Sequence, residues 1–246
     1  IRNCLVGSEM CIRDRKYIGG LSKIEKVSDP IKLSANESAL GPSPRAIKVF
    51  EKDKSKIFKY PESDSNNLRE AISKTYDIDF DRIICGAGSD QIFDLICKLF
   101  LEEGDEVVVS EFGFIMHRIY ASLHGAKICL AKEDKYKVSI DEILKKVSDK
   151  TKIVFIANPN NPTGTYLSKK EMLILREKLR SDILLVVDDA YFEFMNLDDF
   201  SSGLEIFNDS ANVFITRTFS KIYGLAGLRL GWGYASKEII DDMYKI

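Results

Sequence analysis

Histidine and cysteine are scarce in this sequence of 246 residues, which contains two histidines and five cysteines. His117 and His124 lie seven residues apart on one predicted helix, which is too sparse for a metal site without clustered carboxylates. We interpret both as structural or surface residues, and we expect no bound metal. The odd number of cysteines and the lack of a Cys-x-x-Cys pair favour reduced, buried thiols in a cytoplasmic protein over a disulfide framework.

Long apolar runs and an excess of one charge are also lacking. No run approaches the roughly 18 apolar residues that a membrane-spanning helix needs. The 36 basic residues nearly balance the 38 acidic ones, for a net charge of -2. Nothing electrostatic therefore indicates a nucleic acid or an anionic membrane as a partner, and we expect small-molecule ligands instead.

Both ends of the sequence differ from its middle. Residues 1–15 show neither helical nor strand periodicity, and they lack the apolar core of a signal peptide. We expect these residues to be an artefact or disordered. Residues 237–246 are typical of a helix that would continue, so we expect the chain to be a fragment.

The middle of the chain alternates short apolar segments with amphipathic ones, beginning near residue 82. Almost wholly apolar strands separated by helices predict a mostly parallel sheet with both faces covered. Ligands of such sheets bind beyond the carboxyl ends of the strands. Strands are predicted over residues 82–85, 106–110, 126–130, 152–157, 183–187, 213–216 and 228–233, the last in the opposite sense. Helices are predicted over residues 44–51, 65–76, 89–101, 114–124, 140–147, 168–179 and from 237 onward.

One segment that follows a strand, residues 216–229, surrounds Lys221 with hydroxyl groups. Thr218 and Ser220 precede this lysine closely, and Arg229 follows it eight residues later. Hydroxyls and an arginine suit a phosphate, and a lysine amine forms Schiff bases with carbonyl compounds. Pyridoxal phosphate carries both a carbonyl and a phosphate. The alternative is a basic, solvated loop.

Two further segments also follow predicted strands. Residues 86–91 form a glycine turn that opens a helix, whose free N–H groups would bind an anion. This turn nearly matches the dinucleotide fingerprint, so nicotinamide binding is an alternative for it. Residues 157–164 contain two Asn-Pro steps and a glycine, which predict a rigid polar turn or a plain one.

Asp188 ends a predicted buried strand, where a carboxylate is costly without a cationic partner. A metal ion would need further ligands, and none cluster nearby in the sequence. A protonated pyridine nitrogen is the other candidate, because pyridoxal phosphate acts as an electron sink in that state. Tyr191, three residues later, could bond the phenolic oxygen of the same ring. Nicotinamide binding would leave Asp188, Lys221 and Arg229 without a role.

Residues 16–246 resemble the fold-type I pyridoxal-phosphate aminotransferases, and within them the histidinol-phosphate aminotransferase family. The resemblance is strongest in LSANESALGPSP, CGAGSDQIFDLI, ANPNNPTGTYL, VVDDAY and TRTFSKIYGLAGLRLGW. It implies a three-layer α/β sandwich with a mostly parallel mixed sheet, like the large domain of aspartate aminotransferase. Residues 59–246 would be the cofactor-binding large domain, residues 16–58 would contribute to the small domain and substrate site, and the small domain would be incomplete.

The resemblance also assigns roles to individual residues. Lys221 resembles the lysine that links covalently to the cofactor, and Asp188 the partner of the ring nitrogen. Tyr60 resembles a tyrosine that reaches the cofactor phosphate from a second subunit, which implies a homodimer. The other implied contacts are Asn161 and Tyr191 to the ring oxygen, Phe114 stacked on the ring, Ser89, Asp90, Thr218, Ser220 and Arg229 at the phosphate, and Asn36 at the substrate.

The implied reaction transfers an amino group between histidinol phosphate and 2-oxoglutarate, giving imidazole acetol phosphate and glutamate, in histidine biosynthesis. Ser38-Ala39 stands where the family usually has Asn-Pro. The family also continues past the position of Ile246, where it supplies the arginine that grips the substrate. We therefore expect the chain alone to be inactive.

Three alternatives remain open. Two are relatives on the same fold, an aromatic aminotransferase and a phosphothreonine decarboxylase, which would share every cofactor residue. The third is a regulator built on an aminotransferase-like domain, although residues 16–38 leave no room for a helix-turn-helix module.

Overall fold

The computed structural model describes residues 34–246, and the chain divides after Glu37 into two compact units. Residues 34–37 belong to the first unit, and residues 38–246 form the second, which is described here by itself. The predictions for residues 1–15, and those for the part of the 16–58 segment up to residue 33, lie outside the described residues.

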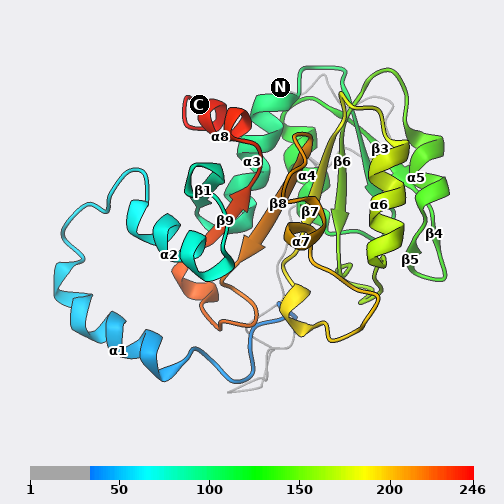
Figure 1. The fold of residues 1–246 in the computed structure, drawn as a ribbon. Coiled ribbons are helices and arrows are strands. Elements are labelled where there is room, and N and C mark those ends of the chain that lie inside the picture. Colours follow the sequence, from blue (N-terminus) through cyan, green and yellow to red (C-terminus); the bar gives the residue numbers. More distant parts are fainter. Residues whose placement is uncertain (1–33) are drawn as a thin grey trace, which may run out of the picture. The chain divides into compact units, whose positions relative to one another are not determined.

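A seven-stranded sheet forms the centre of the second unit, in the order β1-β9-β8-β7-β6-β2-β3 (Figure 1). Every neighbouring pair is parallel except those made by β9, which is antiparallel to both β1 and β8. The predicted mostly parallel mixed sheet is thereby confirmed. The strands are β1 (Ile83–Gly86), β2 (Glu106–Ser110), β3 (Lys127–Ala131), β6 (Thr151–Ala157), β7 (Leu184–Asp188), β8 (Val213–Thr218) and β9 (Gly231–Tyr234).

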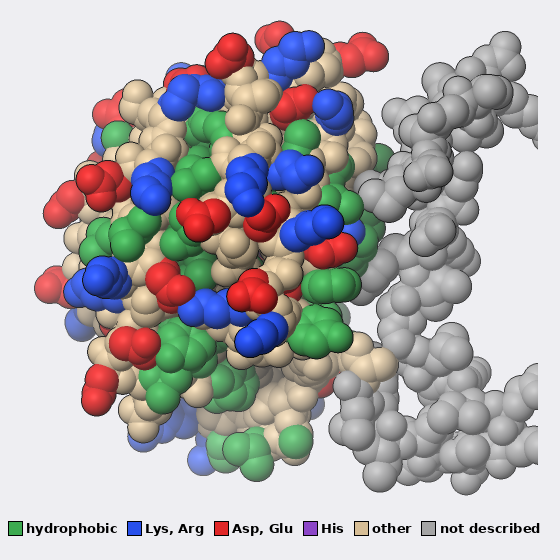
Figure 2. Space-filling view, turned by 90° about the vertical axis from the view of Figure 1, so that its right-hand side faces the viewer, with side chains coloured by type: hydrophobic (Ala, Val, Ile, Leu, Met, Phe, Trp, Pro, Cys, Tyr) green, Lys and Arg blue, Asp and Glu red, His purple; other side chains and the backbone are tan. Residues whose placement is uncertain are grey.

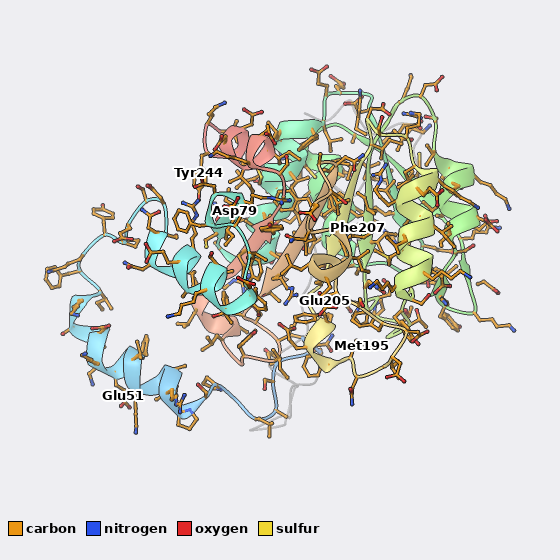
Figure 3. All side chains as sticks on the ribbon, viewed as in Figure 1. Glu51, Asp79, Met195, Glu205, Phe207 and Tyr244 are labelled. Atoms are coloured by element: carbon orange, nitrogen blue, oxygen red, sulfur yellow. The ribbon has the colours of Figure 1, made fainter. Side chains whose placement is uncertain are left out.

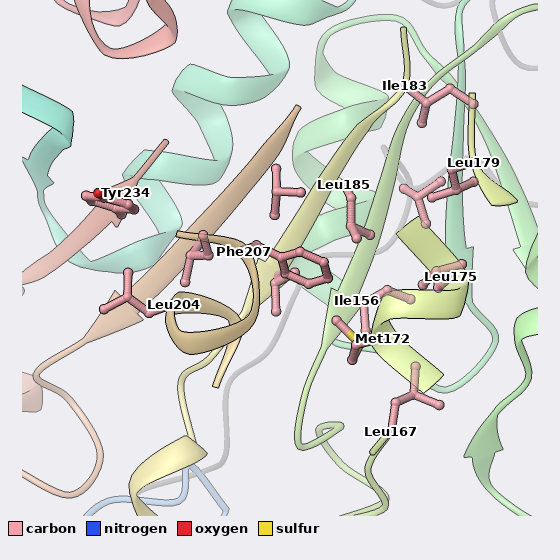
Figure 4. Close-up of a cluster of buried hydrophobic side chains, with 14 of the residues drawn as sticks. Ile156, Leu167, Met172, Leu175, Leu179, Ile183, Leu185, Leu204, Phe207 and Tyr234 are labelled. Atoms are coloured by element: carbon pink, nitrogen blue, oxygen red, sulfur yellow. The ribbon is translucent and has the colours of Figure 1, made fainter. Parts of the chain in front are cut away.

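Helices cover both faces of the sheet and bury two separate apolar clusters. One cluster lies under α2 (Asn66–Tyr76), α5 (Ile140–Lys146), α6 (Lys169–Lys178) and α7 (Gly203–Phe207). The other lies under α3 (Gly88–Phe100), α4 (Ile115–Leu123) and α8 (Lys237–Met243). Figure 4 shows the first cluster, where Met172 and Leu175 of α6 and Phe207 of α7 pack near Ile156 and Leu185 of the sheet. The arrangement is the predicted three-layer sandwich.

Helix starts follow the capping rules that the sequence carries. Ser168 and Glu171 form a capping box at α6, in which each side chain bonds the other's backbone N–H. Ser43 caps α1 (Pro44–Asp53), and Pro44 occupies its first turn, where the missing N–H costs nothing. No residue of α1 is buried, and Figure 3 shows Glu51 among its side chains.

Several short elements were not predicted. They are the hairpin β4 (Glu133–Asp134) and β5 (Lys137–Val138), the helix α7, and the 3₁₀ turns η3 (Lys54–Lys56), η4 (Phe80–Arg82), η5 (Phe192–Phe194) and η6 (Ala226–Leu228). Elements of two to five residues are too short to show a hydrophobic period. The strand predicted from residue 228 begins only at Gly231, because η6 ends at Leu228 and Arg229 takes a left-handed φ of 52°.

Charges of both signs are mixed on the face shown in Figure 2. Among the described residues, no helix is both long enough and apolar enough to cross a membrane. Cys85, Cys97 and Cys129 are free thiols, of which Cys97 is buried and the other two are half-buried; burial raises the pKa of Cys97 to about 12. Cys4 and Cys11 lie outside the described residues.

Candidate active site

The carboxyl ends of three neighbouring strands place Asp188 at the centre of the candidate site. In the sheet register, Asp188 of β7 pairs with Ala157 of β6 and with Thr216 of β8. The Asp188 side chain is buried, and its Oδ1 accepts hydrogen bonds from Thr216 Oγ1 at 3.3 Å and from the Ala190 N–H at 3.2 Å. The carboxylate therefore has a fixed orientation before any ligand arrives.

His117 of α4 faces the other oxygen of this carboxylate, with 3.4 Å between His117 Nε2 and Asp188 Oδ2. Its ring stacks on Phe155 at 4.7 Å and is only 2% exposed. Our interpretation of His117 as a structural or surface residue missed this contact, because no local pattern joins α4 to the end of β7. His124 bonds Asp94 at 2.8 Å, away from Asp188.

Lys221 lies just beyond the end of β8, with its Nζ 5.4 Å from the centre of the Tyr191 ring. The Tyr191 hydroxyl in turn accepts a hydrogen bond of 3.5 Å from Asn161 Nδ2. Three residues from three different post-strand segments therefore meet.

The turn that contains Asn161 is held by a second asparagine. Asn158 Nδ2 donates to the Leu167 carbonyl at 3.0 Å, and its Oδ1 accepts from the Leu167 N–H at 2.8 Å. Asn158 therefore stabilises the turn itself, whereas Asn161 contacts Tyr191 in the candidate site.

The start of α3 lies against β9 and forms a backbone cradle. Gly86 pairs with Gly231, which also pairs with Thr218. A Cβ on Gly231 would come within 2.4 Å of the Ser89 nitrogen, so only glycine lets β9 approach this helix start. Thr218 Oγ1 accepts a hydrogen bond of 3.1 Å from the Ser220 N–H. The free N–H groups of a helix start attract an anion.

Arg229 and Asp90 close the same cradle, with Arg229 Nη2 3.2 Å from Asp90 Oδ2. Burial raises the pKa of Asp90 and the Arg229 charge opposes this. In the sheet, Thr216 pairs with Asp188 and Thr218 pairs with Gly231 of the cradle. The cradle and the Asp188–Lys221 region therefore lie at the same end of β8.

Three predicted site residues differ in their placement. Phe114 precedes α4, and its ring meets the His117 ring edge-on at 5.5 Å, so it joins the site. Tyr60 is fully exposed, so it makes no contact with the rest of the candidate site, and its predicted role would require a second subunit. Asn36 belongs to the first unit, where it takes a left-handed φ of 53°. Among the described residues, no group of three metal-ligand side chains is arranged to hold an ion.

Comparison with known proteins defines the class to which this fold and site belong. Residues 28–246 match the family described as aminotransferase class I and II. The chain belongs to this family. 

Its relatives include the histidinol-phosphate aminotransferases of Pelagibacter ubique, 57% identical over 92% of this chain, and Paramagnetospirillum magneticum, 46% identical over 94%. The chain spans 63% and 64% of these relatives' lengths, a little under two thirds.

Solved structures agree with this assignment. The histidinol-phosphate aminotransferase of Sinorhizobium meliloti, solved in complex with pyridoxal-5'-phosphate, superposes with a TM-score of 0.82 at 29% identity, covering 86% of this chain and 58% of that one. An aspartate aminotransferase from Rhizobium meliloti superposes with a TM-score of 0.78 at 21% identity, covering 86% and 56%, which shows the shared fold.

Proposed function

We propose that the protein containing this chain is a histidinol-phosphate aminotransferase that uses pyridoxal phosphate. The observation that carries the proposal is the buried Asp188 carboxylate, which is oriented by Thr216 of β8 and faces His117, with Lys221 just beyond the end of β8. The relatives of known name supply the substrate, since they are called histidinol-phosphate aminotransferases at up to 57% identity.

The residues present fit pyridoxal phosphate. A cofactor with a phosphate, an aldehyde and a basic ring nitrogen needs an anion cradle, an amine and a carboxylate, and the site holds all three. When bound, this cofactor supplies a carbonyl carbon for amine exchange and a ring that takes up electron density. Its phosphate would be held at the start of α3, by the N–H and hydroxyl of Ser89, by Thr218 and Ser220, and by Arg229.

Asp188 would hold a proton on the ring nitrogen. Its two oxygens have separate neighbours, Thr216 on one side and His117 on the other, so the carboxylate cannot turn away. An anion fixed in a dry site acts more strongly than one in water, because little solvent reorganisation opposes it.

Lys221 would supply the amine that captures the aldehyde. The same Nζ would act as a base and then as an acid, taking up a proton and returning it. Asn161 and Tyr191 would donate hydrogen bonds to the ring oxygen, and Phe114 would cover one face of the ring.

We further propose that the working protein is a homodimer in the cytoplasm. Val49, Phe50 and Ile57 are exposed and line a groove of about 520 Å³ together with Leu228. Exposed apolar patches of this kind are typical of interfaces. A second subunit at this groove would cover it, and would place Tyr60 where the resemblance expects it, at the partner's phosphate.

Substrate assays on the full-length protein test the proposal. The protein should be loaded with pyridoxal phosphate and offered histidinol phosphate, aromatic amino acids and phosphothreonine in parallel, with 2-oxoglutarate as acceptor. We expect the highest kcat/KM for histidinol phosphate. Release of carbon dioxide from phosphothreonine, or preference for an aromatic amino acid, would instead support one of the two relatives on the same fold.

A further inference from the structure

The strand ends that carry the candidate site carry a second group of charged residues on their opposite face. Successive side chains of a strand point to opposite sides. Thr216 and Thr218 of β8 face the site, and Arg217 between them points the other way. Asp189, one residue beyond Asp188, also faces away from the site and toward Arg217.

Arg217 is the centre of this buried group, with a side chain only 3% exposed. Its Nε lies 3.7 Å from Asp189 Oδ2, and its Nη1 lies 3.7 Å from Glu193 Oε1. Its guanidinium stacks on the Phe192 ring at 3.3 Å from the ring centre. Neither Nε nor Nη1 has a hydrogen-bond partner among the described residues, so charge and stacking make the contact.

The carboxylates of this group connect to other elements. Asp189 Oδ2 accepts a hydrogen bond of 2.7 Å from the Gly203 N–H at the start of α7. Burial raises the pKa of Asp189 to about 7, and the Arg217 charge opposes that rise. Burial also raises the pKa of Glu193, and the Arg217 charge opposes that rise.

Arg217 Cζ also lies 5.0 Å from the centre of the Tyr76 ring, and this contact connects the group to the chain on both sides of Lys221. Arg217 lies four residues before the lysine, and Tyr223 lies two residues after it. Tyr223 also shares a hydrogen bond of 2.8 Å with Tyr76 of α2. After the neighbouring strand β7, Phe192 and Glu193 begin the turn η5 and directly follow Tyr191.

We propose that Arg217 is a positioning residue that fixes the Lys221 loop relative to the segment carrying Asp188 and Tyr191. Through Asp189, Phe192 and Glu193 it ties the chain after β7 to β8. Through the Tyr76 ring, 5.0 Å from its Cζ and hydrogen-bonded to Tyr223, it ties the loop after Lys221 to the same point. The inference rests on the proposed function, because it concerns the site at which the cofactor would act. A planar guanidinium suits this task, since it can pair and stack simultaneously, which an ammonium cannot.

The test compares Arg217→Met with Arg176→Met in the full-length protein. Arg176 serves as the control because it is a half-buried arginine that bonds the carbonyls of Ile183, Leu179 and Arg180, at the amino end of β7 and away from the site. Both variants lose packing and polar contacts. Only Arg217→Met should disturb the site.

We expect Arg217→Met to lower kcat by about 10²-fold with little change in KM, the effect of a small misplacement of reacting groups. The pH at which the bound cofactor changes its absorption should also shift. Arg176→Met should keep the parental kcat and pH profile at temperatures where it is folded. Arg217→Lys should recover only part of kcat, because lysine restores the charge but has no planar group to stack on the Phe192 ring.

Removing one buried charge can prevent folding, so a double variant serves as a second measurement. Arg217→Met combined with Asp189→Asn removes one charge of each sign, which lessens the cost of an uncompensated buried ion. We expect it to fold better than Arg217→Met while keeping the low kcat and shifted pH profile. Parental values in the double variant would overturn the proposal.

A measurement without cofactor separates this inference from the proposed function. The rate at which acetic anhydride acylates Lys221, followed by peptide mass spectrometry, reports the surroundings of the amine whether or not a cofactor binds. We expect a several-fold change in Arg217→Met and none in Arg176→Met. A parent that binds no pyridoxal phosphate would overturn the function but not this result. Equal acylation in the parent and both variants, with kcat unchanged, would overturn the role of Arg217.

Discussion

The segment of residues 44–60 and the carboxyl ends of β6 to β8 differ in which kinds of side chain they bury. No residue of α1 is buried, and Phe50, Ile57 and Phe58 face solvent. Asp188, Thr216 and Arg217 are polar or charged, yet all three are buried. The apolar side chains are outside and the charged ones are inside, against the usual distribution.

This difference indicates which of the two regions needs contacts from outside the described residues to cover its side chains. Burying a charge is tolerated only with compensating contacts, and Asp188 and Arg217 find theirs within the chain. The apolar side chains of α1 are not buried by the described residues, which fits the proposal that a second subunit packs on them. The buried charges at the strand ends are compensated within the described residues, and the segment of residues 44–60 is the surface that we propose for an interface.

The largest expected effect is at Lys221. Lys221→Ala should abolish transamination and the absorption of covalently held cofactor in the full-length protein, since no other group at that position can capture the aldehyde. Absorbance spectra and single-turnover assays would check both losses. Lys221→Arg should be equally inactive, because a guanidinium stays protonated and cannot condense. Normal turnover in either variant would show that the lysine is misassigned.

The next effect compares two neighbouring carboxylates that face opposite sides of the sheet. Asp188→Asn should leave the cofactor bound but lower kcat by several orders of magnitude, because a neutral amide does not hold the ring proton. Asp189→Asn should cost far less, since an amide oxygen can still accept the Gly203 N–H bond. Steady-state kinetics on both variants gives the comparison. Equal losses would mean that the ring-nitrogen partner is misassigned.

A smaller effect concerns the pH dependence of stability. The folded pKa of Asp189 is raised from 3.8 to about 7, so the folded state binds the extra proton across that window. Its contribution to stability is fully present below the unfolded pKa and is lost as pH rises through the folded pKa, by at most about 1.4 kcal/mol per pH unit. 

Urea unfolding of the parent and of Asp189→Asn at pH 5, 6, 7 and 8 would measure this contribution. The parent should lose stability relative to the variant as pH rises toward 7 and level off above it. A constant difference across the series would contradict the raised pKa.

The smallest expected effect on stability is at α1. Phe50→Ser should change the free energy of unfolding of a single subunit by no more than about 0.5 kcal/mol, as for other surface positions. It should, however, weaken association of two subunits, which sedimentation would measure. Phe207→Ser is the matched control, because it removes the same ring from the core and should cost about 3–5 kcal/mol. An unchanged dimer in Phe50→Ser would contradict the interface.

The sequence alone determined the order of the elements and their main chemistry. Apolar runs of four to seven residues marked the strands of the sheet, because parallel strands with both faces covered must be apolar throughout. Serines such as Ser43 and Ser168 marked helix starts, because capping is a local interaction. Lys221, Asp188 and Arg229 could be assigned from their positions after strands and from the family resemblance.

Only the tertiary structure decided which of these residues meet. His117 faces Asp188, and Asp189 faces Arg217, because strand order and register bring together segments that are distant in sequence. The alternation of strand faces then separated Asp188 from Asp189 and Thr216 from Arg217. The sequence and the resemblance singled out Asp188 but gave no contact for Asp189. The sheet directs Asp188 toward the candidate site and Asp189 toward a buried arginine.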